Sequence, residues 1–141
     1  MLEKSIVVVL GMHRSGTSAV TRGLAVLGSH LGDVLHPPAV DNPKGFWADS
    51  SCLTLNERLL TQMGSGCDML GCPTKLTESL RTEAGLESLL QDAIHLIREK
   101  VHQAELHGFN ETRTSRRLPF WKVVFRRPVV CRPLSSRYAI R

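Results

Sequence analysis

The residues whose types and spacing most clearly indicate a chemical role form a short loop that follows an apolar segment. Residues 6–10 read Ile-Val-Val-Val-Leu, and Gly11 and Gly16 are then separated by four residues, with Thr17 and Ser18 directly after. This spacing is the frame of a phosphate-binding loop, G-x-x-x-x-G-K-[ST], except that Thr17 stands where the lysine that reaches the β- and γ-phosphates would be. The pattern predicts a loop that binds a phosphate-like group in a nucleotide other than a nucleoside triphosphate.

The segments on either side would direct the loop's amides at an anion. The β-branched apolar run predicts a buried parallel strand over 5–10, and the apolar spacing after the loop predicts a helix over 15–27. Such a helix turns its free N–H groups and the positive end of its dipole toward a ligand. Arg14, inside the loop, adds a guanidinium that can bind an anion with two hydrogen bonds. The alternative is an ordinary strand–turn–helix without a ligand.

Strand and helix patterns alternate along the rest of the chain. We predict strands over 106–109 and 136–141, helices over 50–63 and 84–106, a helical turn over 77–83, and a loop over 30–45. A further helix is predicted within 116–125, starting around Pro119. Gly28 is placed to cap the first helix. The apolar stripe of the 84–106 helix is predicted to be core. The alternation predicts an α/β fold with a parallel sheet and helices on both faces, whose ligands bind at the carboxyl ends of the strands.

Length and composition indicate the general class of this protein. The chain has 141 residues, 42% of them hydrophobic and 22% charged, as expected for one globular domain. The N-terminal apolar run is too short for a membrane span, and Glu3 before it argues against a signal peptide, so we expect a cytoplasmic protein. The four cysteines (Cys52, Cys67, Cys72 and Cys131) form no zinc pattern with the histidines and are predicted to be free thiols.

The net charge is +5, and no Asp or Glu follows Glu111. A basic C-terminal region can attract an anionic nucleotide or acceptor, or be an ordinary solvated surface. We do not expect a nucleic acid partner.

Four segments in the same order along the chain resemble sulfotransferases that use 3′-phosphoadenosine 5′-phosphosulfate (PAPS). Residues 11–18, G-M-H-R-S-G-T-S, look like the loop that binds the 5′-phosphosulfate, and the chain is similar to bacterial sulfotransferase-family proteins with an H-R-S-G-T-S loop. The other matching segments are 41–47 with 55–60, 108–114 with 118–121, and 138–141.

The resemblance implies an enzyme that transfers a sulfuryl group from PAPS to a hydroxyl or amine acceptor, such as a glycan, a lipid or a small molecule, and needs no metal. It implies a three-layer α/β fold like that of the P-loop nucleotide hydrolases. Family members continue past residue 141, so the chain is expected to be a single, partial sulfotransferase-like domain over 1–141.

The resemblance also assigns residues to the site. The donor nucleotide would be bound by the loop and by Arg141, which would meet the 3′-phosphate; the loop residues are His13, Arg14, Ser15, Gly16, Thr17 and Ser18. Arg14 would stabilise the charge that develops during transfer and is therefore also a catalytic residue. Lys44, Phe46 and Trp47 would lie on the acceptor side.

A general base should take the proton of the acceptor hydroxyl. The candidates are Asp49, Glu57, His36 and Glu111. Asp49 is the first choice because it lies beside Trp47 and Ala48, where the family commonly has an acidic residue. Each has a simpler explanation, and Asp49 in particular would cap the helix predicted from Ser50.

The chain departs from the family at a few positions, which keeps two other functions open. Asn110, Glu111 and Thr112 replace Lys, Asp and Pro of the family's G-F-K-D-P-R segment, and Ala48 stands at its acidic position. The alternatives are an inactive nucleotide-binding remnant of the family and a P-loop phosphotransferase or NTPase, the latter disfavoured by Thr17.

Overall fold

The computed structural model of the protein describes residues 4–63 and 84–127. Two strands, β1 (Ser5–Val9) and β2 (Leu106–Asn110), pair in parallel with Ser5 opposite Leu106 and Val9 opposite Asn110. The helices are α1 (Thr17–Val26), α2 (Ser50–Met63), α4 (Ala84–Gln103), α5 (Thr112–Arg116) and α6 (Leu118–Arg126). The described part is therefore a small α/β structure with a two-stranded parallel sheet, which confirms the predicted class in this coarse form.

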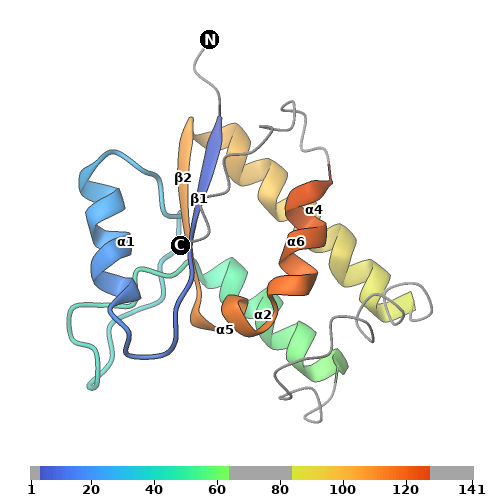
Figure 1. Cartoon of the computed structure of the whole chain (residues 1–141), viewed down its shortest axis with the longest axis horizontal. Helices are drawn as coiled ribbons and strands as arrows, with labels where there is room; N and C mark the ends of the chain where they lie inside the picture. The colour runs from blue at the N-terminus through green and yellow to red at the C-terminus, as the bar shows by residue number, and fades with distance from the viewer. Residues whose placement is uncertain (1–3, 64–83, 128–141) are drawn as a thin grey trace.

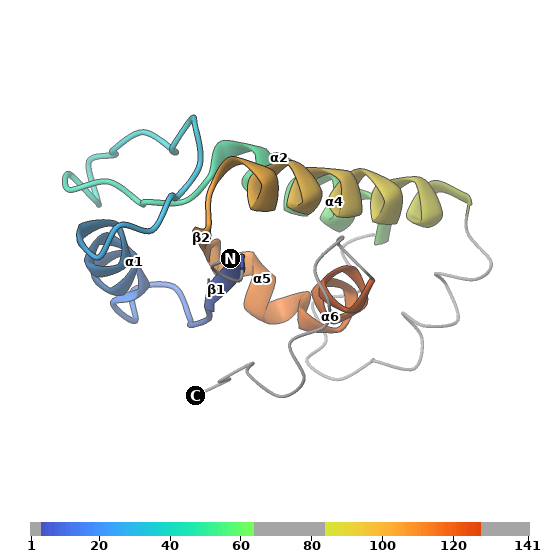
Figure 2. The same ribbon diagram turned by 90° about the horizontal axis from the view of Figure 1, so that it is seen from above.

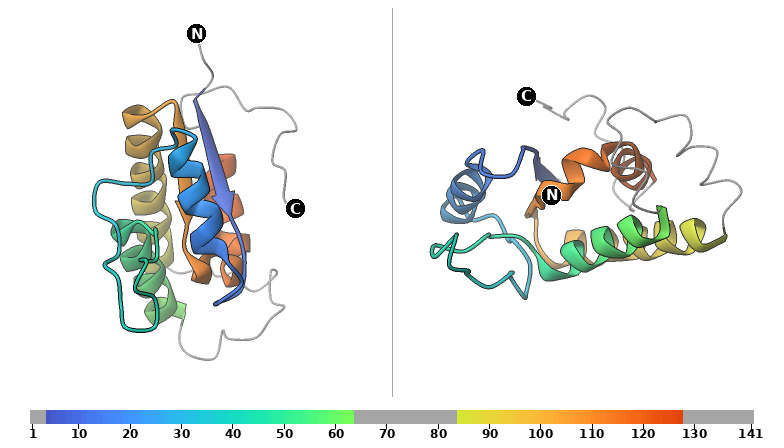
Figure 3. Two further views of the ribbon diagram at one scale, coloured as in Figure 1. Left: turned by 90° about the vertical axis from the view of Figure 1, so that its left-hand side faces the viewer. Right: turned by 90° about the horizontal axis from the view of Figure 1, so that it is seen from below.

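The sheet separates two unequal groups of elements (Figures 1 and 2). Helix α1 and the long loop that follows it lie on one side, whereas α2, α4 and α6 lie on the other. Figure 3 shows α1 running alongside the strands. Because the strands are parallel, the loop after β1 and helix α5 after β2 leave the sheet at the same edge.

The hydrophobic core lies on the side of α2, α4 and α6. The apolar stripe predicted for the long helix is buried throughout, as an amphipathic helix requires; it consists of Leu86, Leu89, Leu90, Ala93, Ile94, Ile97 and Val101. It packs with Leu55 and Leu59 of α2, Phe109 of β2 and Trp121 of α6. The rings of Phe109 and Trp121 lie 4.9 Å apart.

Most predicted element bounds agree with the structure. The strand over 106–109 and the helix over 50–63 are confirmed. Gly28 follows α1 with a φ of 89°, and its N–H donates to the Ala25 carbonyl at 3.0 Å, as expected of a capping glycine. Helix α4 ends at Gln103 and not at 106, because Leu106 already belongs to β2.

Two predictions need correction. The helix predicted to start around Pro119 is confirmed as α6, but residue 116 belongs to a separate helix, α5, which begins at Thr112 and was not predicted. Strand β1 is not buried throughout, because Val7 is 36% exposed and only Val9 is classed as buried. The cause is that α1 packs mainly against β2 and leaves part of β1 uncovered.

Several predictions lie outside the described residues. They concern the turn over 77–83, the strand over 136–141, Arg141, and the three cysteines at 67, 72 and 131. The remaining cysteine, Cys52, is a buried free thiol. Within the described ranges, no helix combines the length and the apolar character needed to cross a membrane.

Candidate functional site

The loop after β1 folds so tightly that its first glycine cannot be replaced without displacing neighbours. A Cβ atom on Gly11 would lie 2.5 Å from Thr17 Cγ2 and 2.6 Å from Ser15 Oγ. The Gly11 N–H donates to Ser115 Oγ at 3.0 Å, and that hydroxyl donates to the Gly11 carbonyl at 3.2 Å. Gly16 ends the loop with a φ of 88°, a conformation that favours glycine. The glycine spacing therefore has a direct structural cause.

The first turn of α1 leaves backbone donors available to a ligand. The N–H groups of Ala19 and Val20 donate to the Gly16 carbonyl at 3.0 and 3.2 Å. Those of Thr17 and Ser18 have no acceptor within the described part of the chain. Free amides at a helix N-terminus, together with the helix dipole, are a general means of binding an anion.

Arg14 connects the loop to the opposite wall of the site. It has a φ of 64°, unusual for a residue other than glycine. Its Nη1 donates to the Asp41 carbonyl at 2.7 Å. Trp47, on that wall, is the second such residue, with a φ of 55°, and its Nε1 donates to the Lys44 carbonyl at 3.0 Å. These are the non-glycine residues with positive φ in the described ranges, and both line one cleft.

That cleft has a volume of about 750 Å³ and lies between α1, the 36–48 loop and the start of α5. It collects most of the residues that the sequence assigned to the site, namely His13, Arg14, Gly16, Thr17, Ser18, Lys44, Phe46 and Trp47. Ser15 is an immediate neighbour whose hydroxyl donates to the Met12 carbonyl at 2.6 Å. Arg141 lies outside the described residues.

The charges along the cleft are predominantly positive. Arg14, Arg22, Lys44 and Arg113 line it, against the two carboxylates of Asp41 and Glu111. The Arg22 guanidinium lies over the Trp47 ring, 5.9 Å from its centre, in a cation–π arrangement. Arg113 is partly neutralised by Glu57, which accepts from its Nη1 at 3.3 Å. The cleft therefore favours an anionic ligand.

Asn110, the last residue of β2, also lines the cleft. Asn110 Nδ2 and Ser18 Oγ each donate to the Phe46 carbonyl at 3.2 Å, which joins β2, α1 and the 36–48 loop at one point. The side chain of Asn110 is buried, and its Oδ1 has no hydrogen-bond partner. The sequence showed Asn110 only as a departure from the family pattern. Its position directly after a parallel strand was the signal that could have identified it as a site residue.

Glu111 is a buried carboxyl group in the same cleft. It accepts a hydrogen bond from Asn56 Nδ2 at 2.6 Å. Burial raises the pKa of this carboxyl, and the backbone N–H and guanidinium of Arg113 and the Asn56 amide partly oppose the rise. Glu111 was one of the four general-base candidates, and it lines the cleft, as does His36, whose ring centre lies 4.9 Å from that of Phe46.

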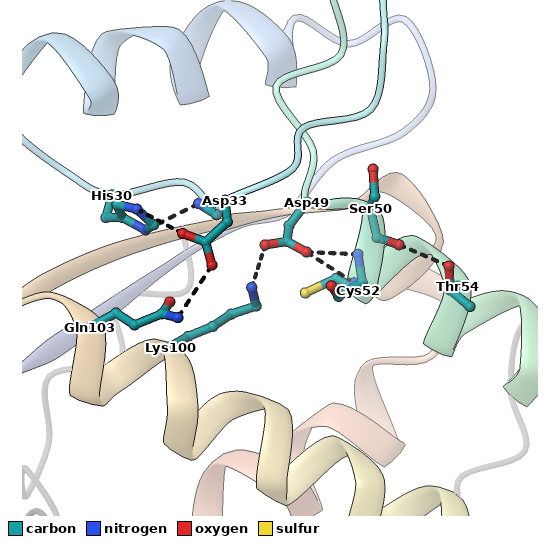
Figure 4. Close-up of polar contacts among 10 residues, drawn as sticks. His30, Asp33, Asp49, Ser50, Cys52, Thr54, Lys100 and Gln103 are labelled. Atoms are coloured by element: carbon teal, nitrogen blue, oxygen red, sulfur yellow. Dashed lines mark hydrogen bonds and ion pairs between the residues drawn. The ribbon is translucent and has the colours of Figure 1, made fainter.

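Asp49, the first choice as base, has a different set of partners (Figure 4). Its Oδ2 is paired with Lys100 of α4, and both side chains are about 95% buried. Its Oδ1 accepts from the Ser51 N–H at 2.8 Å, which confirms the alternative that Asp49 caps α2. Asp49 is absent from the residues that line the cleft. Its role as a base remains a prediction.

In the described ranges no group of three or more His, Cys, Asp and Glu side chains is arranged as a metal site. Comparisons of this chain with models of protein families, with curated proteins and with solved structures find no match.

Proposed function

We propose that this chain binds the nucleotide PAPS in the cleft and transfers its sulfuryl group to a hydroxyl-bearing acceptor. The observation that carries the proposal is the N-terminus of α1, where the free N–H groups of Thr17 and Ser18 face a cationic cleft beside Arg14. The proposal also includes a three-layer, sulfotransferase-like fold for the protein and a cytoplasmic location.

The loop is suited to a phosphosulfate better than to a nucleoside triphosphate. Thr17 occupies the position of the P-loop lysine, and its side chain is buried within the turn. No ammonium group can therefore extend from this position to a terminal phosphate. The amides, the Ser18 hydroxyl and the Arg14 guanidinium remain, and they match the oxygen atoms of a phosphosulfate.

Sulfuryl transfer makes limited demands on a protein. The acceptor oxygen and the leaving phosphate oxygen must be held in line, and the charge that develops on the leaving group must be stabilised. In this proposal the first turn of α1 and Arg14 bind the transferred group and the leaving phosphate. Lys44, Phe46 and Trp47 form the acceptor wall on the other side of the cleft.

Calorimetric titration with 3′-phosphoadenosine 5′-phosphate (PAP), the product nucleotide, tests the proposal. We expect PAP to bind the wild-type protein, and Arg14→Ala to weaken binding about tenfold or more, since a charge-assisted contact contributes roughly 1.5–3 kcal/mol. Lys122→Ala is the matched control, because it removes a positive charge from α6, whose residues do not line the cleft.

Two results would refute the proposal. One is the absence of PAP binding in a wild-type sample shown to be folded, which would favour an inactive remnant that no longer binds the nucleotide. The other is tighter binding of ATP with Mg²⁺ than of PAP, which would favour a phosphotransferase or NTPase.

A further inference from the structure

One residue that lines the cleft has a buried polar atom whose hydrogen-bonding capacity is unused. Asn110 is 4% exposed, and its Oδ1 has no partner although its Nδ2 donates to the Phe46 carbonyl. A buried acceptor without a donor is costly, by about 1–3 kcal/mol. The Nδ2 bond fixes the orientation of the amide, because the reverse orientation would place two carbonyl oxygens against each other. Asn110 Oδ1 is therefore set to accept a hydrogen bond from a ligand.

This residue lies beside the group that the loop is proposed to bind. Asn110 is the last residue of β2 and pairs with Val9, the last residue of β1, so it stands at the same edge as the loop. Asn110 and Ser18 share the Phe46 carbonyl as acceptor, which places Asn110 next to the first turn of α1. A hydroxyl bound to Asn110 Oδ1 would therefore be adjacent to an anion held by that turn.

The neighbouring residue can accept the proton of such a hydroxyl. Glu111 directly follows Asn110, lines the same cleft and is 4% exposed. Asn56 of α2 holds one carboxylate oxygen, Oε2, at 2.6 Å. The charged groups near this carboxyl are Arg113 of α5, the helix that Glu111 directly precedes, and Glu57 of α2.

The rest of the cleft indicates what the hydroxyl is attached to. Besides Thr17, Ser18 and Arg22, the lining from α1 and α2 consists of Ala19, Gly23, Val26 and Leu53, so part of this wall is apolar. Val26, which lines the cleft, is 82% exposed, and Val20 of α1 and Leu27 directly after it are 56% and 77% exposed. Exposed apolar side chains at a cleft are typical of a binding site for an apolar ligand.

We infer that Asn110 and Glu111 bind and activate the acceptor, and that the acceptor is an alcohol with an apolar body. The inference rests on the proposed function. Before transfer, the hydroxyl donates to Asn110 Oδ1, which holds the alcohol beside the sulfur atom of PAPS. The hydroxyl then turns its proton toward the Glu111 carboxylate, which takes it as the alcohol oxygen forms a bond to that sulfur. The bond between the sulfur and the 5′-phosphate oxygen breaks, and PAP leaves with the electron pair.

The test measures sulfation of 2-phenylethanol with radiolabelled PAPS, together with PAP binding, for each variant. Asn110→Ala should raise KM for the alcohol about tenfold, the effect of losing one hydrogen bond to a buried acceptor, and leave PAP affinity unchanged. Glu111→Gln keeps an acceptor for Asn56, and should lower kcat by about 10²–10⁴. It should also remove the acidic limb of the pH–rate profile, which a merely structural residue would not do.

Ser18→Ala is the matched variant for Asn110→Ala, because it removes the other hydrogen bond to the Phe46 carbonyl. We expect it to weaken PAP binding, whereas Asn110→Ala should not. Equal effects of the two variants on both ligands would show that Asn110 only supports the Phe46 loop, and would overturn its assignment. Wild-type kcat and an unchanged pH profile in Glu111→Gln would overturn the assignment of the base.

The acceptor class has its own control. Methyl glucoside offers hydroxyls without an apolar body, and we expect it to be a much poorer acceptor than 2-phenylethanol. Sulfation of the glucoside alone, or of neither compound by a protein that binds PAP, would overturn the class while leaving the nucleotide site intact. A folded wild-type protein that does not bind PAP would refute the proposed function and this inference with it.

Discussion

The buried ion pair between Asp49 and Lys100 offers a sharp test of what Asp49 does. Both side chains are almost completely buried, and the pair joins the start of α2 to α4. Lys100→Met would leave the Asp49 carboxylate buried without its cation. Removing one partner of a buried pair costs about 3–5 kcal/mol, because the other charge loses its compensation. We expect Asp49→Asn to cost a similar amount, since it leaves the Lys100 ammonium buried in turn.

The double variant, Asp49→Asn with Lys100→Met, gives a different expectation. It removes both charges, while the Asn side chain can still accept the Ser51 N–H and cap α2. Replacing a buried pair by neutral groups is often close to neutral in stability. We therefore expect the double variant to be more stable than either single variant, with a coupling free energy of about 3 kcal/mol or more.

Urea unfolding followed by tryptophan fluorescence measures this cycle, because Trp121 is fully buried in the core. Additive effects of the two single variants, or a loss below about 1 kcal/mol for Lys100→Met, would contradict the reasoning. The double variant also separates a structural Asp49 from a catalytic one. If it folds and retains sulfation activity, Asp49 is not the base; if it folds and is inactive, the earlier assignment of Asp49 regains support.

Three further predictions concern stability. Gly32 has a φ of 124°, and an added Cβ would lie 2.7 Å from Asp49 Cγ, so Gly32→Ala should lower the free energy of unfolding by about 2 kcal/mol or more in urea titrations. Burial lowers the pKa of His107 to about 4 from 6.5, with Lys100 and His30 adding to the shift and Asp49 and Asp33 opposing it. Below pH 6.5 the unfolded chain then binds a proton that the folded chain refuses, so stability should fall by about 2 kcal/mol between pH 7.5 and 5. A His107→Leu variant should lose that pH dependence, and an unaltered dependence would exclude His107 as its source. Trp121→Phe removes the donor to Asn56 Oδ1 at 2.9 Å and should cost about 2 kcal/mol or more, measured as a lower Tm than that of a Trp47→Phe control.

The elements predicted best from sequence are those fixed by local patterns. The bounds of α2 agree because a capping residue, Asp49, precedes its first residue. Helix α4 was identifiable from a long apolar stripe at steps of three and four. Helix α5 was missed because T-R-T-S-R has no apolar periodicity. Its position depends on a tertiary contact, the hydrogen bonds between Ser115 and Gly11, which are 104 residues apart in the chain.

The same division holds for the candidate site. The loop was predictable because its backbone needs glycine at two fixed positions, whatever lies around it. The partners of Asp49 were only half predictable. Its cap to Ser51 is local, whereas Lys100 is 51 residues away and its side chain could not be placed from the sequence. The unpaired oxygen of Asn110 likewise follows from how three elements meet at the Phe46 carbonyl.

Among the described residues, the cleft shares none with the hydrophobic cluster formed by α2, α4, α6 and β2. Variants of cleft residues such as Arg14 should therefore change binding much more than stability, because they remove no core packing. Asn56 is the link between the two regions. This buried side chain accepts from the core residue Trp121 through Oδ1 and donates to Glu111 through Nδ2. The core thus fixes one oxygen of the Glu111 carboxylate, which suits the proposed role of Glu111 as a general base, because such a base must be held in place by its surroundings.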